Sequence, residues 1–118
     1  MGITNTASDG TPPMSRVILL RTKLEREHRT AGVEIRRITM VPGHPSGFHV
    51  HNCPVFGSIV EGSAIYQVEG KPARVLHVGD VFYEAEGAPI ARFDATDEGV
   101  TFLGYFLLED GQEPGISS

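Results

Sequence analysis

Short runs of apolar residues, separated by turn residues, recur through most of the chain. The turns are rich in glycine and proline and stand about eight to twelve residues apart, which is typical of an all-β sandwich or barrel. Apolar and polar positions alternate over residues 33–40, with one slip at Arg36 and Arg37 that predicts a β-bulge. Turns at 61–62 and 94–99 should separate neighbouring strands. We expect strands at 33–40, 55–60, 64–68, 75–76, 81–83, 90–93 and 100–108.

The two ends of the chain do not follow this pattern. Residues 1–15 are small and polar and lack the basic start and apolar stretch of a signal peptide, so we expect a flexible leader. Residues 109–118 should form a similarly loose tail, which leaves 16–108 as a single domain. The apolar run 17–20 precedes the first strand. An all-β domain must cover its sheet edges, and pairing this run across a second copy would do so, which predicts a homodimer.

Composition narrows the class of protein. With 118 residues, 40% of them hydrophobic, the chain has the size and apolar content of one globular domain. Its net charge of −5 disfavours nucleic acid as a partner, and it has no apolar run long enough to span a membrane. Cys53 is the single cysteine, so a disulfide framework is excluded and a cytoplasmic location is expected. We expect Cys53 to be an ordinary small residue; the alternative is a redox-sensitive thiol near His51.

One histidine-containing segment carries a recognisable motif. Residues 43–51 read Gly-x5-His-x-His, where His49 and His51 are the two histidines, and Gly62 follows eleven residues later. This segment resembles the first motif of the cupins, and residues 79–90 match the outline of the second. Residues 82–84 and 90–94 are also similar to a branch of small bacterial cupins. The resemblance covers about residues 33–108 and implies an all-β cupin fold, a double-stranded β-helix or jelly-roll barrel.

Four positions depart from the cupin motifs. The motif glutamate is replaced by Val55, and the motif proline, histidine and asparagine are replaced by Ala85, Ile90 and Asp94. The resemblance implies a metal site of three histidines and one glutamate, of which only His49 and His51 remain at their motif positions.

His49 and His51 are candidate ligands of one divalent metal ion, Fe, Mn, Ni or Zn. Residues two apart on a strand point the same way, so both side chains can enter the barrel. Glu84 is the nearby carboxylate that would complete a set of two histidines and one carboxylate, although a strand carboxylate is more often exposed. The alternative is a hydrogen-bonded histidine pair without metal. His44 and His77 lie at predicted turns and should face solvent.

The candidate contacts to a small-molecule ligand are Arg92, Tyr66, Phe82 and Phe102. If Ile90 takes the place of the inward-facing motif histidine, Arg92 shares its face and reaches the barrel mouth, where a guanidinium can bind a carboxylate or phosphate. The alternative is an ion pair with Asp94 or Asp97 on the outside. The aromatic residues are core and interface residues, some of which should line an apolar pocket.

Three functions remain open at this point. The first is a small-molecule-binding cupin with a partial two-histidine metal site. The second is a metal-dependent enzyme of dioxygenase, isomerase or lyase type, which the cupin resemblance allows, with His49, His51 and Glu84 as metal ligands. The third is a non-catalytic dimeric module. The glycines stand singly at turns rather than in a phosphate-binding loop, so no organic cofactor is expected.

Overall fold

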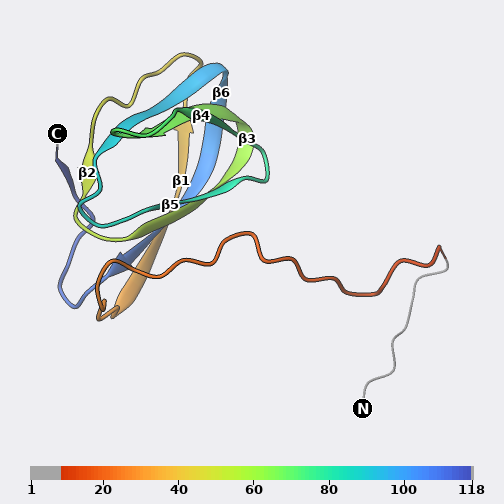
Figure 1. Ribbon diagram of the computed structural model, residues 1–118, viewed down its shortest axis with the longest axis horizontal. Coiled ribbons are helices and arrows are strands. Elements are labelled where there is room, and N and C mark those ends of the chain that lie inside the picture. Colours follow the sequence, from red (N-terminus) through yellow and green to blue (C-terminus); the bar gives the residue numbers. More distant parts are fainter. Residues whose placement is uncertain (1–8, 118) are drawn as a thin grey trace.

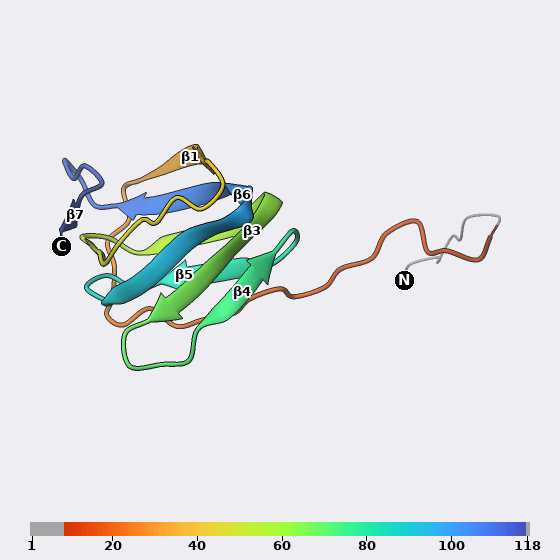
Figure 2. The same cartoon turned by 90° about the horizontal axis from the view of Figure 1, so that it is seen from above.

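The computed structural model describes residues 9–117, which form an all-β structure without helices (Figure 1). Its strands are β1 (Gly32–Met40), β2 (Val50–His51), β3 (Val55–Val68), β4 (Arg74–His77), β5 (Val81–Glu84), β6 (Ile90–Leu108) and β7 (Ile116–Ser117). One antiparallel sheet has the order β1-β6-β3-β4, with β5 also paired to β3, and β2 pairs with β7 in a small second sheet. The strands wrap around a common interior (Figure 2). The expected all-β class is therefore confirmed.

Strands β3 and β6 are much longer than the sequence pattern predicts. Each continues through a segment where we expected a turn, at residues 61–62 in β3 and 94–99 in β6. The two strands pair along most of their length, and three register shifts let them bend together without breaking. Gly62 lies at one of these bends with a φ of 70°, and a Cβ there would collide with the carbonyl oxygen of Gly99. The expected turns are thus bends within continuous strands.

The slip in the alternation of β1 is not a bulge, because its register with β6 is continuous from end to end. Instead, the apolar residues change faces along the strand. Val33 and Ile35 lie on the outer face and are 56% and 60% exposed, whereas Ile38 faces the interior. Arg36 shares the inner face by alternation, and its guanidinium carbon lies 4.9 Å from the ring centre of Phe106. The predicted bulge is wrong, and the outer face carries apolar side chains.

Aromatic side chains fill much of the interior. The rings of Phe82, Phe93 and Phe102 have centroids 4.7 to 6.0 Å apart, and Tyr66 packs edge-on against Phe93. Phe82 lies opposite Gly57 of β3, where a Cβ would overlap its ring. The close approach of this ring to the sheet therefore depends on a glycine at that position.

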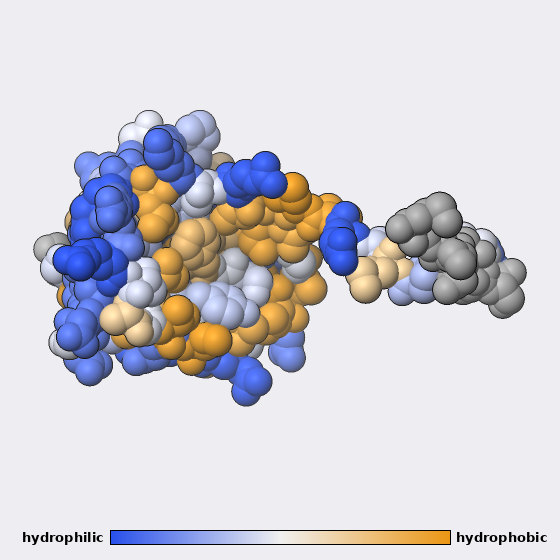
Figure 3. All heavy atoms as spheres, turned by 90° about the horizontal axis from the view of Figure 1, so that it is seen from below, coloured by the Kyte–Doolittle hydropathy of each residue, from blue (hydrophilic) through white to orange (hydrophobic). Residues whose placement is uncertain are grey.

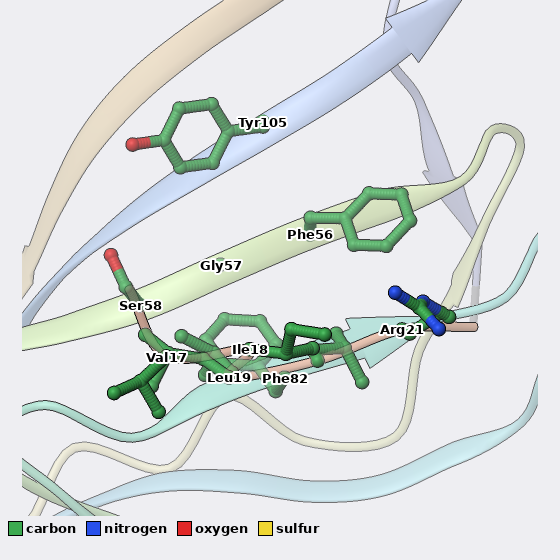
Figure 4. A pocket seen from close by; sticks show the side chains of 11 residues that line it. Val17, Ile18, Leu19, Arg21, Phe56, Gly57, Ser58, Phe82 and Tyr105 are labelled. Atoms are coloured by element: carbon green, nitrogen blue, oxygen red, sulfur yellow. The ribbon is translucent and has the colours of Figure 1, made fainter. Parts of the chain in front are cut away.

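The later part of the segment that precedes β1 runs along the outside of the barrel, whereas its first described residues extend away from it (Figures 1 and 2). Residues 9–31 form no helix or strand, and residues 1–8 of the expected leader lie outside the described part of the chain. Residues 17–21 line an open groove of about 690 Å³ together with Phe56 and Tyr105 (Figure 4). Arg26 forms ion pairs with Glu86 at 2.9 Å and Glu109 at 3.3 Å, and these contacts connect the segment to the barrel.

The segment after β6, where a loose tail is expected, includes a short strand. It contains β7, which pairs with β2, and Asn52 holds it through several hydrogen bonds. The backbone N–H of Asn52 donates to the Gly115 carbonyl, and its side-chain amide donates to the Glu113 carbonyl. The N–H of Gly115 donates to the side-chain oxygen of Asn52 at 2.8 Å. A strand of two residues held by one asparagine leaves no hydrophobic pattern in the sequence, so the pattern did not indicate it.

A candidate metal centre

Three side chains with metal-binding groups meet inside the barrel. His49, His51 and Glu84 each place one donor atom within 4.8 Å of the others. The Nε2 atom of His51 lies 2.7 Å from Oε1 of Glu84, and the Nε2 atom of His49 lies 3.7 Å from the same oxygen. Glu84 is 3% exposed, so the expectation that a strand carboxylate here would face solvent is wrong. The structure brings together the three residues named from the sequence.

Strand pairing explains why these residues converge. His49 exchanges two backbone hydrogen bonds with Ile90 of β6, and His51 lies two residues further on, so both imidazoles point the same way. Glu84 ends β5 and pairs directly with Val55 of β3. Directly paired residues of neighbouring strands share one face of a sheet. The carboxylate that the first motif lacks at Val55 is therefore supplied from the adjacent strand.

Hydrogen bonds and burial act in opposite directions on the ionisation of this cluster. Burial raises the pKa of the Glu84 carboxyl, but its interactions with His49 and with the hydrogen-bonded His51 outweigh burial and leave that pKa below its ordinary value. The nearby Glu84 carboxylate, 3.7 Å from its Nε2, raises the pKa of His49, against the opposing effect of burial. The second carboxylate oxygen, Oε2, is buried and has no hydrogen-bond partner within the described part of the chain, residues 9–117. Because a buried acceptor without a partner is costly, this oxygen is suited to a further ligand.

The donor set fits a divalent metal ion. Two imidazoles and one carboxylate form a common ligand set for such ions. With metal–ligand bonds of about 2.0–2.2 Å, donors at right angles lie about 3 Å apart. The two nitrogen–oxygen distances at Glu84, 2.7 and 3.7 Å, lie on either side of that value. Nδ1 of His49 lies 3.1 Å from the carbonyl oxygen of Gly47, and an N–H donated there leaves Nε2 free to face the cluster.

A cavity of about 210 Å³ opens onto the two histidines. Phe102, one of the four expected ligand contacts, lies in its wall. The other apolar wall residues are Ile38, Met40, Val55, Phe93, Phe106 and Ile116. The lining also contains Gly104, and Ser46 is its polar side chain besides the histidines. The histidine pair therefore meets an almost wholly apolar space.

Arg92 does not line this cavity. Its side chain is 44% exposed, and its Nε donates to the Asp94 carboxylate at 2.8 Å. Between Ile90 and Arg92 the register of β6 shifts, since Ile90 pairs with Val68 whereas Arg92 pairs with Gln67. The extra residue on β6 turns Arg92 to the outer face. The structure thus corrects the inward orientation and shows the external ion pair that was the alternative.

Two other expected ligand contacts belong to the core. Tyr66 and Phe82 are 5% and 2% exposed and do not line the cavity at the histidines. Cys53 is fully buried, and burial raises the pKa of its thiol, which is the opposite of what activates a cysteine. His44 and His77 are exposed, as expected, and lie outside the cluster, although His77 ends strand β4 rather than lying in a turn.

Some cavity residues were not named from the sequence, although one signal was present. Phe106 lies four residues after Phe102, so strand alternation places the two rings on one face of β6. Met40 and Ile38 share a face of β1 in the same way. Ile116 had no such signal, because its position depends on the hydrogen bonds that hold β7 to β2.

Comparison with known proteins places the fold. No protein-family model and no curated protein matches the sequence. An oxalate oxidase, solved with the substrate analogue glycolate, matches with a TM-score of 0.62 and 22% identity over 73% of this chain and 45% of that one. The DMSP lyase DddQ from Ruegeria pomeroyi matches with a TM-score of 0.62 and 24% identity over 75% of this chain and 43% of that one. An RmlC-like cupin from Shewanella frigidimarina matches with a TM-score of 0.58 and 19% identity over 72% of each chain.

The aligned part of this chain spans less than half the length of the first two of these structures. In the described part of the chain, no helix is long and apolar enough to cross a membrane. The expected barrel, the His-x-His segment inside it and the matching structures agree with one another. This chain therefore has the cupin fold.

Proposed function

We propose that this protein binds one divalent metal ion through His49, His51 and Glu84, and a small organic molecule beside it. The buried carboxylate of Glu84 carries the proposal, because one oxygen faces both histidines and the other has no partner. A bound cation would compensate this buried charge and satisfy the free oxygen. It would also offer open coordination positions to a ligand. Fe, Mn, Ni and Zn are the candidate metals, since imidazole and carboxylate suit each of them.

Elemental analysis of the full chain tests the metal site. After incubation with Fe(II), Mn(II), Ni(II) or Zn(II) and desalting, we expect close to one ion per chain for at least one metal. His49→Ala and Glu84→Gln should lose it. His44→Ala and Glu86→Gln are matched controls, because both residues lie outside the cluster, and they should retain the metal. Retention in the cluster variants, or equal loss in the controls, would contradict the proposal.

A metal-dependent enzyme of dioxygenase, isomerase or lyase type is the second candidate. Three protein donors leave metal coordination positions for a substrate, and the two histidines line a cavity that could hold one. His49 and His51 would orient the ion, Glu84 would offset its charge, and the apolar walls would exclude water. Dioxygen uptake by the Fe(II)-loaded protein, with product analysis for oxygen-independent reactions, tests this candidate over a panel of small organic compounds. Turnover that His49→Ala abolishes would support an enzyme; turnover of no compound would leave the binding function.

We also propose a homodimer formed through the outer face of β1 and the segment 17–20. Ile35 is 60% exposed, and Ile18 and Leu19 are 68% and 67% exposed. Figure 3 shows hydrophobic side chains gathered where the N-terminal segment meets the barrel. Because β1 is an edge strand of the large sheet, a second copy could cover both the edge and these side chains.

Sedimentation analysis of the full chain at micromolar concentration tests the dimer. We expect a particle of about twice the chain mass of 12.8 kDa. Ile35→Glu should yield monomers, because it places a charge in the apolar contact. Thr39→Glu, on the same face of β1 but away from the apolar residues, is the control. A wild-type particle of 12.8 kDa would contradict the dimer.

We propose that the protein is located in a reducing bacterial cytoplasm. Cys53 is the single cysteine and is buried as a free thiol, which suits a chain that forms no internal disulfide. Fractionation of cells that express the protein naturally tests the compartment, and recovery from an oxidising compartment would contradict it.

A further inference from the structure

The size of the cavity beside the two histidines restricts what can occupy it. Its volume is about 210 Å³. An apolar cavity of about 150 Å³ can hold benzene, whereas sites for drug-sized ligands begin at about 300 Å³. The space therefore suits one ring with one or two small substituents.

Aromatic walls favour a flat ring in this space. Phe93 and Phe102 have centroids 4.7 Å apart with their planes inclined by 49°, and both line the cavity. Phe106 lines it as well, and its ring centroid lies 6.1 Å from that of His51. A single ring in contact with Phe106 could therefore direct a substituent towards the histidines. Edge-to-face and offset contacts with these phenylalanines would add to the hydrophobic effect.

Charge argues against an occupant with two negative groups. Among residues 9–117, no lysine or arginine lines the cavity. Arg36 lies against the Phe106 ring but is paired with Glu34, and Arg92 is paired with Asp94. A divalent ion held by one carboxylate and two neutral imidazoles carries a net charge of +1, which one negative oxygen neutralises. A dicarboxylate would leave an uncompensated negative charge in an apolar cavity, and that is costly.

We infer that the cavity takes a small ring compound with an ionisable hydroxyl group, a phenol or catechol, in preference to a dicarboxylate. The ring lies among Phe93, Phe102 and Phe106, and the hydroxyl oxygen faces His49 and His51. This inference rests on the proposed metal site, because the metal supplies the positive charge that the oxygen meets.

Calorimetric titration of the Zn(II)-loaded full chain with catechol and with oxalate tests the inference. Elemental analysis after each titration checks that the metal remains bound. Catechol should bind roughly tenfold or more tightly than oxalate, because the cavity lacks a second cation. Phe102→Ala should weaken catechol binding by roughly tenfold through the lost aromatic contact and leave Zn(II) binding unchanged. If Phe102→Ala does not fold, Phe102→Leu removes the ring while keeping an apolar side chain.

Leu103→Ala is the matched control, because Leu103 neighbours Phe102 on β6 but does not line the cavity. It should bind catechol as the wild type does. Ile38→Lys adds a cation to the wall and should raise the affinity for oxalate. Oxalate binding as tight as that of catechol, or equal catechol affinity in the Phe102 and Leu103 variants, would overturn the inference.

Failure of the proposed metal site gives a different result. The wild type would then bind no Zn(II), and the inference would be tested on the metal-free chain with phenol, by the shift in melting temperature. A shift that Phe102→Leu abolishes would support the ring-binding cavity without the metal. If phenol does not shift the melting temperature either, the ring-binding inference fails as well as the metal site.

Discussion

Replacing Glu84 by glutamine separates its metal-binding role from its structural one. The substitution keeps the shape of the side chain and removes its charge. In the metal-free protein it loses a charged hydrogen bond with His51, of 2.7 Å, which is worth about 1.5–3 kcal/mol. It also removes a buried negative charge that is incompletely hydrogen-bonded, which relieves about 1–3 kcal/mol, although the amide still leaves one buried polar atom without a partner. Because these effects nearly cancel, we expect the metal-free unfolding free energy to change by about 1 kcal/mol or less.

The metal-bound protein should respond very differently. An ion present at about 100 times its dissociation constant stabilises the native state by about 2.7 kcal/mol. For a domain of this size, that corresponds to a rise in melting temperature of about 10 °C, at about 4 °C per kcal/mol. Glu84→Gln lacks the anionic ligand, so its melting temperature should rise by less than about 2 °C under the same conditions.

Differential scanning calorimetry with and without Zn(II), after treatment with a chelator, measures both effects. Glu86→Gln is the matched control, because Glu86 lies two residues further on and binds Arg26 at 2.9 Å on the outside. Glu86→Gln should keep the full rise in melting temperature on addition of Zn(II). A full rise in Glu84→Gln would refute Glu84 as a ligand. A loss of more than about 3 kcal/mol in its metal-free form would show that the buried ion pair is mainly structural.

Three further predictions follow from the same geometry. Gly57→Ala should lower the unfolding free energy by about 1–3 kcal/mol in chemical denaturation, because its methyl group overlaps the Phe82 ring. Gly32→Ala is the control and should leave the unfolding free energy unchanged, since there is open space around its Cβ. Equal effects of the two substitutions would contradict this packing. Ile90→His should tighten Zn(II) binding by roughly tenfold in a competition titration, because the backbone of residue 90 pairs with His49 and a new imidazole could join the cluster. Unchanged Zn(II) affinity would show that this imidazole does not reach the cluster. The melting temperature of the metal-free protein should fall at acid pH, as the Glu84 carboxyl, whose pKa is lowered, becomes protonated. It should fall again as the pH rises through the raised pKa of His49. A melting temperature that does not change with pH would show that the pair adds no stability.

Local patterns in the sequence were enough to indicate the fold. Alternating apolar residues and regularly spaced turns predicted an all-β domain, and the Gly-x5-His-x-His segment predicted a cupin barrel with two histidines facing its interior. The all-β class and the shared face of the histidines depend on strand periodicity, which places residues two apart on the same side, whereas the cupin barrel is what the resemblance to the cupin motifs implied. The same periodicity could have identified Phe106 as a neighbour of Phe102 in the cavity wall.

Cross-strand register decided what the local pattern could not. The sequence named Glu84 as a candidate ligand, but only its pairing with Val55 brings the carboxylate to the histidines. One extra residue on β6 turned Arg92 outwards, and the hydrogen bonds of Asn52 brought Ile116 to the cavity. A shift of one residue reverses the face of a side chain, and register depends on contacts between segments far apart in the chain. The sequence by itself therefore determined the barrel and its histidine pair, whereas the tertiary structure decided the third donor and the apolar walls.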